Sequence, residues 1–261
     1  MPGADFDIAQ DAALLFDQVR QAGQMALERF RAGVASWHKP DGSVLTETDL
    51  EVDRFLKASL LAARPDYGWL SEETADDGAR LSRPMLWIVD PIDGTRAFAK
   101  GGDEWCVTGA LVKDGLPVAA AVYRPLTDDF YHATAGGGSF CNAARLKAGD
   151  GPLAGCRMMG TRRALTPLLA HGIVPEWPGE QPLLLRLARV AEASLDAALS
   201  LGAKNDWDLA AGHLLVQEAG GRMTDARNRP MVFNRIGSVQ DGVLAAGLTR
   251  HQALIKLMER E

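Results

Sequence analysis

The sequence predicts an α/β protein in which layers of helices alternate with layers of sheet. Apolar residues recur at helical spacing in residues 7–31 and 48–63, which predicts two long amphipathic helices. Two apolar runs, 106–112 and 116–123, flank the turn Asp114-Gly115, and this arrangement is typical of a β-hairpin. The second half of the chain alternates short helical and strand-like segments. Together these patterns favour alternating helix and sheet layers.

The other expected elements are short. Apolar runs at 67–71 and 85–89 are flanked by Pro, Gly or Asp and predict buried strands. A strand at 129–135 would continue the meander, which Gly136-Gly137-Gly138 would end. Gly220-Gly221 is a helix stop signal. The second half is expected to hold helices at 183–193, 208–219 and 251–259, and strands near 157–160, 195–199, 221–224 and 242–246.

Length and composition fit one domain, 1–261, with sub-domains of roughly 1–147 and 153–261. The chain is 47% apolar and 24% charged, as is ordinary for a soluble globular protein. Its net charge of −6 and the lack of a basic block argue against a nucleic acid polymer as partner. A small phosphorylated metabolite remains a reasonable ligand, because a bound metal could supply positive charge.

Cysteine usage and hydropathy indicate a cytoplasmic protein that does not enter a membrane. The cysteines Cys106, Cys141 and Cys156 are far apart and show no CxxC spacing, so we expect them to be buried and reduced. The N-terminus has neither a basic segment nor an apolar core, so we expect no signal peptide. The longest unbroken apolar runs are far too short to span a bilayer.

Five carboxylates in three places suggest the chemistry: Glu72, Glu73, Asp90, Asp93 and Asp208. Each group follows apolar or aromatic residues, and burying an acid is costly unless a cation compensates it. Carboxylate oxygens suit hard cations such as Mg²⁺. Metal held in this way usually serves phosphate chemistry.

The segment from Asp90 to Thr95 is the densest of these motifs. A buried strand is expected to end at Val89, and Pro91 biases Asp90 away from helical backbone, so that its carboxylate would point out. Gly94 permits a tight turn and close approach of a ligand. A helix that begins near Thr95 would face its amides towards an anion. The segment therefore predicts a metal and phosphate site.

Each motif alone also has a simpler explanation. The segment 90–95 could be a turn with two solvated acids, and paired acids such as Glu72-Glu73 are usually solvated in loops. Asp208 could simply cap the helix that follows it. The occurrence of all three in one chain, each at the edge of an element, favours a common site.

These motifs together resemble the inositol monophosphatase superfamily. The resemblance rests on Leu-Ser-Glu-Glu at 70–73, Trp-Ile-Val-Asp-Pro-Ile-Asp-Gly-Thr at 87–95, Trp-Asp-Leu-Ala-Ala-Gly at 207–212 and Glu-Ala-Gly-Gly at 218–221, and it covers roughly residues 10–247. It implies an α/β/α/β/α sandwich and a Mg²⁺-dependent, lithium-sensitive phosphomonoesterase. Members of the family are often dimers, so a homodimer is possible by analogy, although the sequence does not determine the oligomeric state.

The resemblance implies a site for two or three Mg²⁺ ions. Glu72, Asp90 and the backbone carbonyl of Ile92 would hold one ion. Asp90, Asp93 and Asp208 would hold a second, so that Asp90 bridges the two. Such a pair of ions would clamp the attacking and leaving oxygens of an in-line displacement.

The resemblance also implies the catalytic groups. Thr95, hydrogen-bonded to Asp49, would with Glu72 orient the attacking water. The amides of Gly94 and Thr95 would bind the phosphate, and Asp93 and Asp208 would lie against the substrate. Lys39 resembles a family lysine that precedes the Asp49 element, but a lone surface lysine is the more common explanation for such a residue.

Two departures from the family pattern bear on the substrate. The Gly-Ser-rich junction is missing at 179–184, and residues 200–203 lack the Glu that meets an inositol hydroxyl, which argues against inositol specificity. Residues 70–73, 93–101 and 210–213 look like the 3'(2'),5'-bisphosphate nucleotidase branch, which slightly favours 3'-phosphoadenosine 5'-phosphate as the substrate. Inositol-1-monophosphatase, histidinol-phosphate phosphatase and a non-catalytic metal- or phosphate-binding relative are the alternatives.

Overall fold

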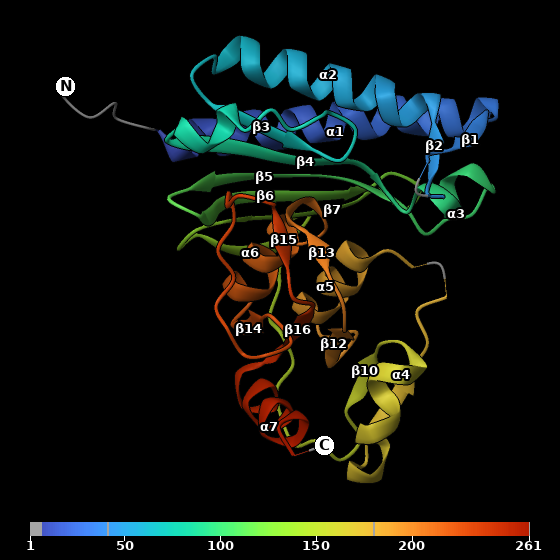
Figure 1. Cartoon of the computed structure of the whole chain (residues 1–261), viewed down its shortest axis with the longest axis vertical. Coiled ribbons are helices and arrows are strands. Elements are labelled where there is room, and N and C mark those ends of the chain that lie inside the picture. The colour runs from blue at the N-terminus through green and yellow to red at the C-terminus, as the bar shows by residue number, and fades with distance from the viewer. Residues whose placement is uncertain (1–6, 41, 180, 261) are drawn as a thin grey trace.

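The chain folds into five stacked layers of alternating helix and sheet (Figure 1). A computed structural model describes residues 7–40, 42–179 and 181–260. From one end of the molecule to the other, Figure 1 shows the helices α1 and α2, a seven-stranded sheet, the helices α5 and α6, a five-stranded sheet, and an outer layer with α7 and α4. The predicted α/β/α/β/α layering is confirmed.

The helices have the following bounds: α1 Ile8–Ala32, α2 Glu47–Ala63, α3 Thr95–Ala99, α4 Arg162–Leu165, α5 Leu183–Ala191, α6 Ala210–Glu218 and α7 Leu248–Met258. Short 3₁₀ turns lie at Ala79–Ser82, Thr166–His171 and Asp206–Asp208. The first two long helices thus match their predicted spans to within one residue.

The first sheet has the order β3-β4-β5-β6-β7-β8-β9. Its strands β3 and β4 are parallel, and all the other pairs are antiparallel. The bounds are β3 Gly68–Ser71, β4 Met85–Asp93, β5 Cys106–Lys113, β6 Leu116–Arg124, β7 Asp129–Thr134, β8 Gly138–Cys141 and β9 Ala144–Arg145. The predicted hairpin and meander therefore form the centre of this sheet.

The second sheet has the order β11-β10-β12-β16-β14 and comes entirely from the second half of the chain. Its bounds are β10 Arg157–Met159, β11 Val174–Glu176, β12 Ala197–Ser200, β14 Gly221–Thr224 and β16 Val243–Gly247. Two small ribbons complete the structure: β1 Ser36–His38 with β2 Val44–Thr46, and β13 Lys204–Asn205 with β15 Val239–Gln240.

The long helix α1 covers the first sheet because its apolar stripe meets a sheet surface with little side-chain bulk. Leu15 and Val19 are fully buried. A Cβ atom at Gly109 of β5 would lie only 2.9 Å from Leu15 Cδ1, so this glycine lets the helix approach closely. Burial of each such side chain contributes about 2 kcal/mol. At its start, the carboxylate of Asp7 accepts hydrogen bonds from the Ala9 and Gln10 amides and caps the helix.

The middle layer brings the second half of the chain against the first sheet. Gly212 of α6 faces Leu187 and Leu184 of α5 so closely that an added Cβ would lie 2.4 Å from Leu187 Cδ1. This close crossing holds the start of α6 beside the start of α5. Both helix starts carry or contact residues of the site described below.

Several expectations for the fold need correction. The meander does not end at residues 136–138, because Glu218 accepts hydrogen bonds from the Gly136 and Gly138 amides and holds them as a turn into β8. The ribbons and the segment α4–β11 were not predicted. Cys106 and Cys156 are buried and free as expected, but Cys141 is only partly buried.

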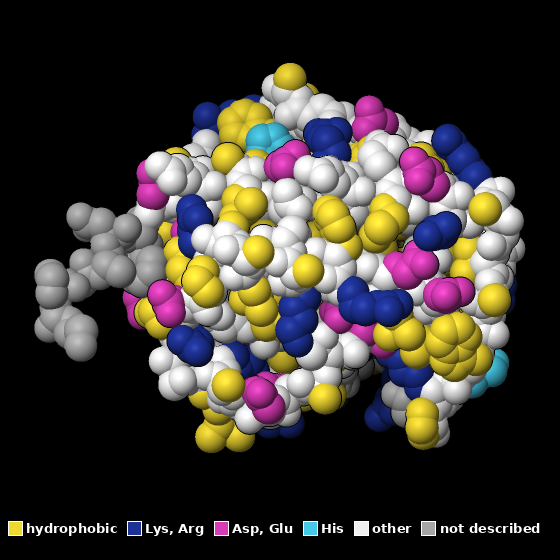
Figure 2. Space-filling view, turned by 90° about the horizontal axis from the view of Figure 1, so that it is seen from above, with side chains coloured by type: hydrophobic (Ala, Val, Ile, Leu, Met, Phe, Trp, Pro, Cys, Tyr) yellow, Lys and Arg dark blue, Asp and Glu magenta, His cyan; other side chains and the backbone are white. Residues whose placement is uncertain are grey.

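Figure 2 views the α1 and α2 face, where Lys and Arg side chains are interspersed with Asp and Glu. Among the described helices, none is both long and apolar enough to cross a bilayer.

Candidate metal centre

A bulge in β4 brings Asp90 and Asp93 to one side of the sheet. Asp90 pairs with Thr108 and Asp93 with Cys106, so three steps along β4 match two along β5. Thr108 and Cys106 share a face because they are two residues apart, and their cross-strand partners lie on that face with them. The strand was expected to stop at Val89, but it continues to Asp93, because the bulge accommodates Pro91 without a ladder hydrogen bond.

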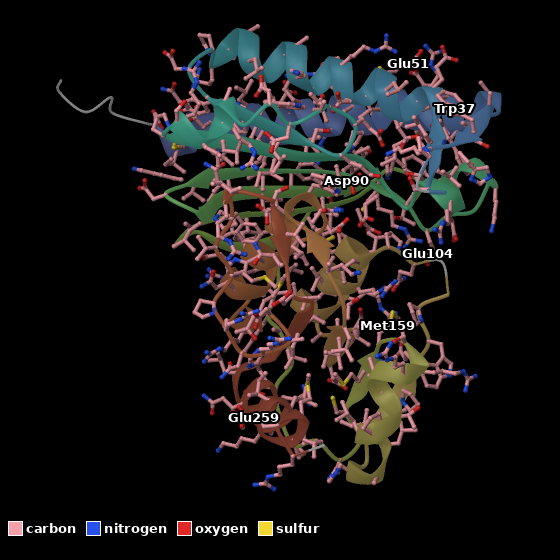
Figure 3. The ribbon with its side chains drawn as sticks, in the orientation of Figure 1. Trp37, Glu51, Asp90, Glu104, Met159 and Glu259 are labelled. Atoms are coloured by element: carbon pink, nitrogen blue, oxygen red, sulfur yellow. The ribbon has the colours of Figure 1, made fainter. Side chains whose placement is uncertain are left out.

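Asp90 is buried rather than pointing out of the strand end, as had been expected. Its side chain belongs to a residue only 2% exposed, and its Oδ1 has no hydrogen-bond partner among the described residues. Burial, together with the charges of Glu72 and Asp93, raises the pKa of Asp90 well above its usual range. Figure 3 shows Asp90 within the molecule, near the end of β4 that leads to α3. Such an oxygen requires either a proton or a cation.

Asp93 and Asp208 reach the same region from different elements. Asp93 Oδ2 accepts a hydrogen bond of 3.0 Å from the Leu184 amide at the start of α5, and Asp208 Oδ2 accepts one of 2.9 Å from the Asn205 amide. Burial and the charge of Asp208 raise the pKa of Asp93 to about 7. Burial raises the pKa of Asp208 to about 6, and the charge of Glu72 adds to the rise. The carboxylates therefore influence one another strongly.

Glu72 lies just after β3 and is paired with Lys39. Lys39 Nζ is 3.1 Å from Glu72 Oε1 and 2.7 Å from Glu73 Oε1. Only 18% of the Lys39 side chain is exposed, so it is not a freely solvated surface lysine. Burial raises the pKa of Glu73 to about 7 although Lys39 opposes the rise.

Thr95 is tied to Asp49 as the family resemblance implied. Asp49 belongs to the capping box of α2, where its carboxylate accepts a hydrogen bond of 2.8 Å from the Thr46 amide. Thr95 Oγ1 lies 3.1 Å from Asp49 Oδ1 and 2.9 Å from the carbonyl oxygen of Ile92. The hydroxyl has one hydrogen and can donate to either acceptor. Burial raises the pKa of Asp49 to about 6.

The carboxylate oxygens of this site are the type of ligand that a hard cation prefers, but the side chains are not arranged around a single point. Among the described residues, no three Asp, Glu, His or Cys side chains are arranged as a finished metal site. Instead, Lys39 pairs with Glu72, and the Leu184 and Asn205 amides donate to Asp93 and Asp208. The unpartnered Oδ1 of Asp90, buried among other carboxylates, is the atom that a Mg²⁺ ion would satisfy.

A cavity of about 310 Å³ opens on this cluster. Of the predicted site residues, Glu72, Asp93, Gly94 and Thr95 line it. The remaining lining residues were not predicted: Ser43, Val44, Arg96, Gly179, Gln181, Pro182 and Arg186. The motif that contains Thr95 also contains Arg96 and could have indicated it.

Arg186 gave no such signal, because its helix was predicted only from apolar periodicity. It donates a hydrogen bond of 2.8 Å to the carbonyl oxygen of Gln181, and the Gln181 side chain donates one of 2.9 Å to Glu104. Figure 3 shows Glu104 at the edge between the first sheet and the segment that leads into α5. Gly179, Gln181 and Pro182 thus form one wall of the cavity; Glu180 lies outside the described residues.

Gly94 cannot be replaced without strain. Its φ is +102°, and a Cβ atom there would lie 2.5 Å from the Glu104 carbonyl oxygen. We expect Gly94→Ala to lower the free energy of unfolding by about 1–3 kcal/mol and to reduce turnover. Gly101→Ala is the matched control, because Gly101 also has a positive φ, +74°, but open space around its Cβ position. Urea unfolding and steady-state kinetics would test this; equal losses in the two variants would contradict it.

Comparison with known proteins decides the family. The sequence model of the family described as "Inositol monophosphatase family" matches residues 7–261. The chain belongs to the inositol monophosphatase family. The predicted resemblance is therefore confirmed, and with it the enzyme class, a metal-dependent phosphoric monoester hydrolase.

The similar proteins carry several names. An inositol-1-monophosphatase from Rhizobium meliloti is 35% identical over 205 residues, covering 72% of this chain and 74% of the relative. The 3'(2'),5'-bisphosphate nucleotidase CysQ from Aggregatibacter actinomycetemcomitans is 26% identical over 269 residues, covering 96% of each. A solved IMPase/NADP phosphatase complexed with Mg²⁺ and phosphate has the same fold, with a TM-score of 0.82, 20% identity, and coverage of 97% of this chain and 96% of that one. These names do not agree on one substrate.

Proposed function

We propose that this protein hydrolyses a small phosphomonoester by Mg²⁺-dependent activation of water, with 3'-phosphoadenosine 5'-phosphate or a related bisphosphate nucleotide as its favoured substrate. The buried Asp90 Oδ1 has no hydrogen-bond partner among the described residues and feels the negative charge of neighbouring carboxylates, and it carries the metal part of the proposal. The solved neighbour that was complexed with Mg²⁺ and phosphate supports it by analogy.

Glu72, Asp90, Asp93, Asp208 and the Ile92 carbonyl would hold the ions. Bound Mg²⁺ would supply neutralisation of phosphate charge and a more acidic water. The protein's own contribution is positioning. Thr95, oriented by Asp49, and Glu72 would align the attacking water, and the Gly94 and Thr95 amides would bind phosphate oxygens.

Two guanidinium groups favour a substrate with a second phosphate. Arg96 and Arg186 line the same cavity as Asp93 and Thr95. Arg96 is exposed and makes no hydrogen bond or ion pair with another described residue, so it is available to a ligand. Arginine matches phosphate oxygens bidentately. A bisphosphate nucleotide would use this charge, whereas inositol 1-phosphate has no second anionic group for it.

Inositol-1-monophosphatase is the second candidate, because a relative with that name is 35% identical to this chain. The two candidates are separated by Mg²⁺-dependent phosphate release from 3'-phosphoadenosine 5'-phosphate and from inositol 1-phosphate, compared as kcat/KM. A clear preference for the nucleotide is expected. A preference for inositol 1-phosphate would overturn the proposed substrate, and no hydrolysis of either, or of histidinol phosphate, would favour a non-catalytic relative.

Arg96→Gln should raise KM for 3'-phosphoadenosine 5'-phosphate by about tenfold, because the variant loses one charge-assisted hydrogen bond to the second phosphate. KM for inositol 1-phosphate should change little, because that substrate lacks the second phosphate. Arg163→Gln is the control, since Arg163 is exposed and lies outside the lining of the cavity. An equal effect of Arg96→Gln on both substrates would assign Arg96 to the scissile phosphate instead.

A further inference from the structure

A second cavity, of about 470 Å³, lies beside α6, β14 and the start of α7. It shares no lining residue with the cavity at the metal centre. In Figure 1 these three elements lie together, away from the end of the first sheet that carries β2 and α3. We call it the α6–α7 cavity.

The walls of the α6–α7 cavity are largely apolar. Met223 and Met231 are buried and lie in its lining, while Leu116 and Leu248 line it and are 53% and 50% exposed. A cavity of this size with an apolar interior and a few polar groups has the usual make-up of a small-molecule site. Methionine side chains adapt to flat aromatic ligands.

One charged group in the lining has no partner. Arg222 of β14 is half-buried, and its guanidinium makes no hydrogen bond or ion pair with any other residue in the described ranges. Most other half-buried arginines in this structure are paired, as Arg189 is with Glu176 at 2.9 Å. A guanidinium group left unpaired next to an apolar wall is suited to an organic anion.

One buried polar group in the lining is also unmatched. His213 of α6 is 6% exposed, and its Nδ1 has no hydrogen-bond partner among the described residues. Its ring packs edge-on against Phe233, with ring centroids 5.5 Å apart. Burial lowers the pKa of His213 to about 4, so the ring is neutral at pH 7 and can donate or accept a hydrogen bond.

From the cavity, the unpaired guanidinium of Arg222 and the unmatched imidazole of His213, we propose that the α6–α7 cavity binds a small organic anion with a flat apolar body, such as an aromatic carboxylate. The carboxylate would pair with Arg222, and the ring would lie between the methionine side chains. Inorganic phosphate would leave the apolar walls without a partner. A neutral aromatic molecule would leave Arg222 unpaired.

Isothermal titration with 2-naphthoate tests this on the full chain in the presence of Mg²⁺ and saturating inorganic phosphate, which should fill the metal centre. One saturable site per chain is expected. Arg222→Gln should weaken binding by at least about tenfold. Leu248→Trp should abolish it, because an indole at this half-exposed position would fill the mouth of the cavity. The neutral analogue 2-naphthylmethanol should bind more weakly than 2-naphthoate.

Arg227→Gln is the matched control, because Arg227 is an exposed arginine after β14 that does not line the cavity. Thermal melts of all variants check that they fold. No saturable binding to the wild-type protein would overturn the proposal. Binding that survives both Arg222→Gln and Leu248→Trp would overturn it as well, since the anion would then occupy another site.

Discussion

Replacing Asp93 with Asn should reduce Mg²⁺-dependent turnover by about 10²–10³-fold or more while the fold persists. The change keeps the shape of the side chain and the acceptor for the Leu184 amide, 3.0 Å away, but removes one charge from the proposed metal ligands. The metal-free variant should be at least as stable as the wild-type protein at pH 8, because buried carboxylates repel one another there. Kinetics and thermal melts without metal would measure both effects.

Asp66→Asn is the matched control for this experiment. The Asp66 side chain is 91% exposed, and its Oδ1 lies 3.9 Å from the Arg83 guanidinium. Asp66 is not one of the proposed metal ligands. It should leave turnover unchanged. Unchanged turnover in Asp93→Asn would refute the metal assignment. Lost turnover with a lost fold would instead give Asp93 a structural role, through its contact with α5.

The parts of the fold that sequence patterns predicted best are those with long periodic runs. Helix α1 was expected at 7–31 and spans Ile8–Ala32, and the hairpin around Asp114-Gly115 is present. The ribbon β1–β2 was missed, because all three residues of β1 are exposed and carry no apolar alternation. The edge strand β11 was missed for the same reason: Val174 is exposed, and Pro175 interrupts the run.

The site residues were predictable where a sequence motif identified them. They were not predictable where only the tertiary structure brings a residue next to the site. The resemblance supplied Asp49 as the partner of Thr95, and the contact is present at 3.1 Å. The bulge after Asp90 could not be read from the sequence, since Pro91 suggested a strand end. Arg186 was missed because only the fold of α5 against the first sheet turns it towards Asp93. The ligand roles themselves remain predictions.

The metal-free protein should lose stability as pH rises, and Mg²⁺ should restore it. Asp49 and Asp208 have folded-state pKa values of about 6 and Asp93 of about 7, against an ordinary value of 3.8. A carboxyl with a raised folded-state pKa contributes stability below pH 3.8 that is lost as pH rises through the folded-state value. At about 1.4 kcal/mol per pKa unit, the loss from these three groups between pH 5 and 8 is on the order of 5 kcal/mol.

Thermal melts in EDTA and in excess Mg²⁺, at pH 5 and pH 8, would measure this. Burial lowers the pKa values of His213 and His251 to about 4. These two groups therefore reduce the stability of the folded state as pH falls below 6.5, which is opposite to the effect of the carboxyls. The informative quantity is therefore the gain in Tm from Mg²⁺ at each pH, expected to be larger by roughly 10 °C at pH 8. EDTA should abolish activity at pH 8 while the protein stays folded. Unfolding on chelation would make the metal structural, and an equal Mg²⁺ gain at both pH values would mean that these carboxylates do not hold it.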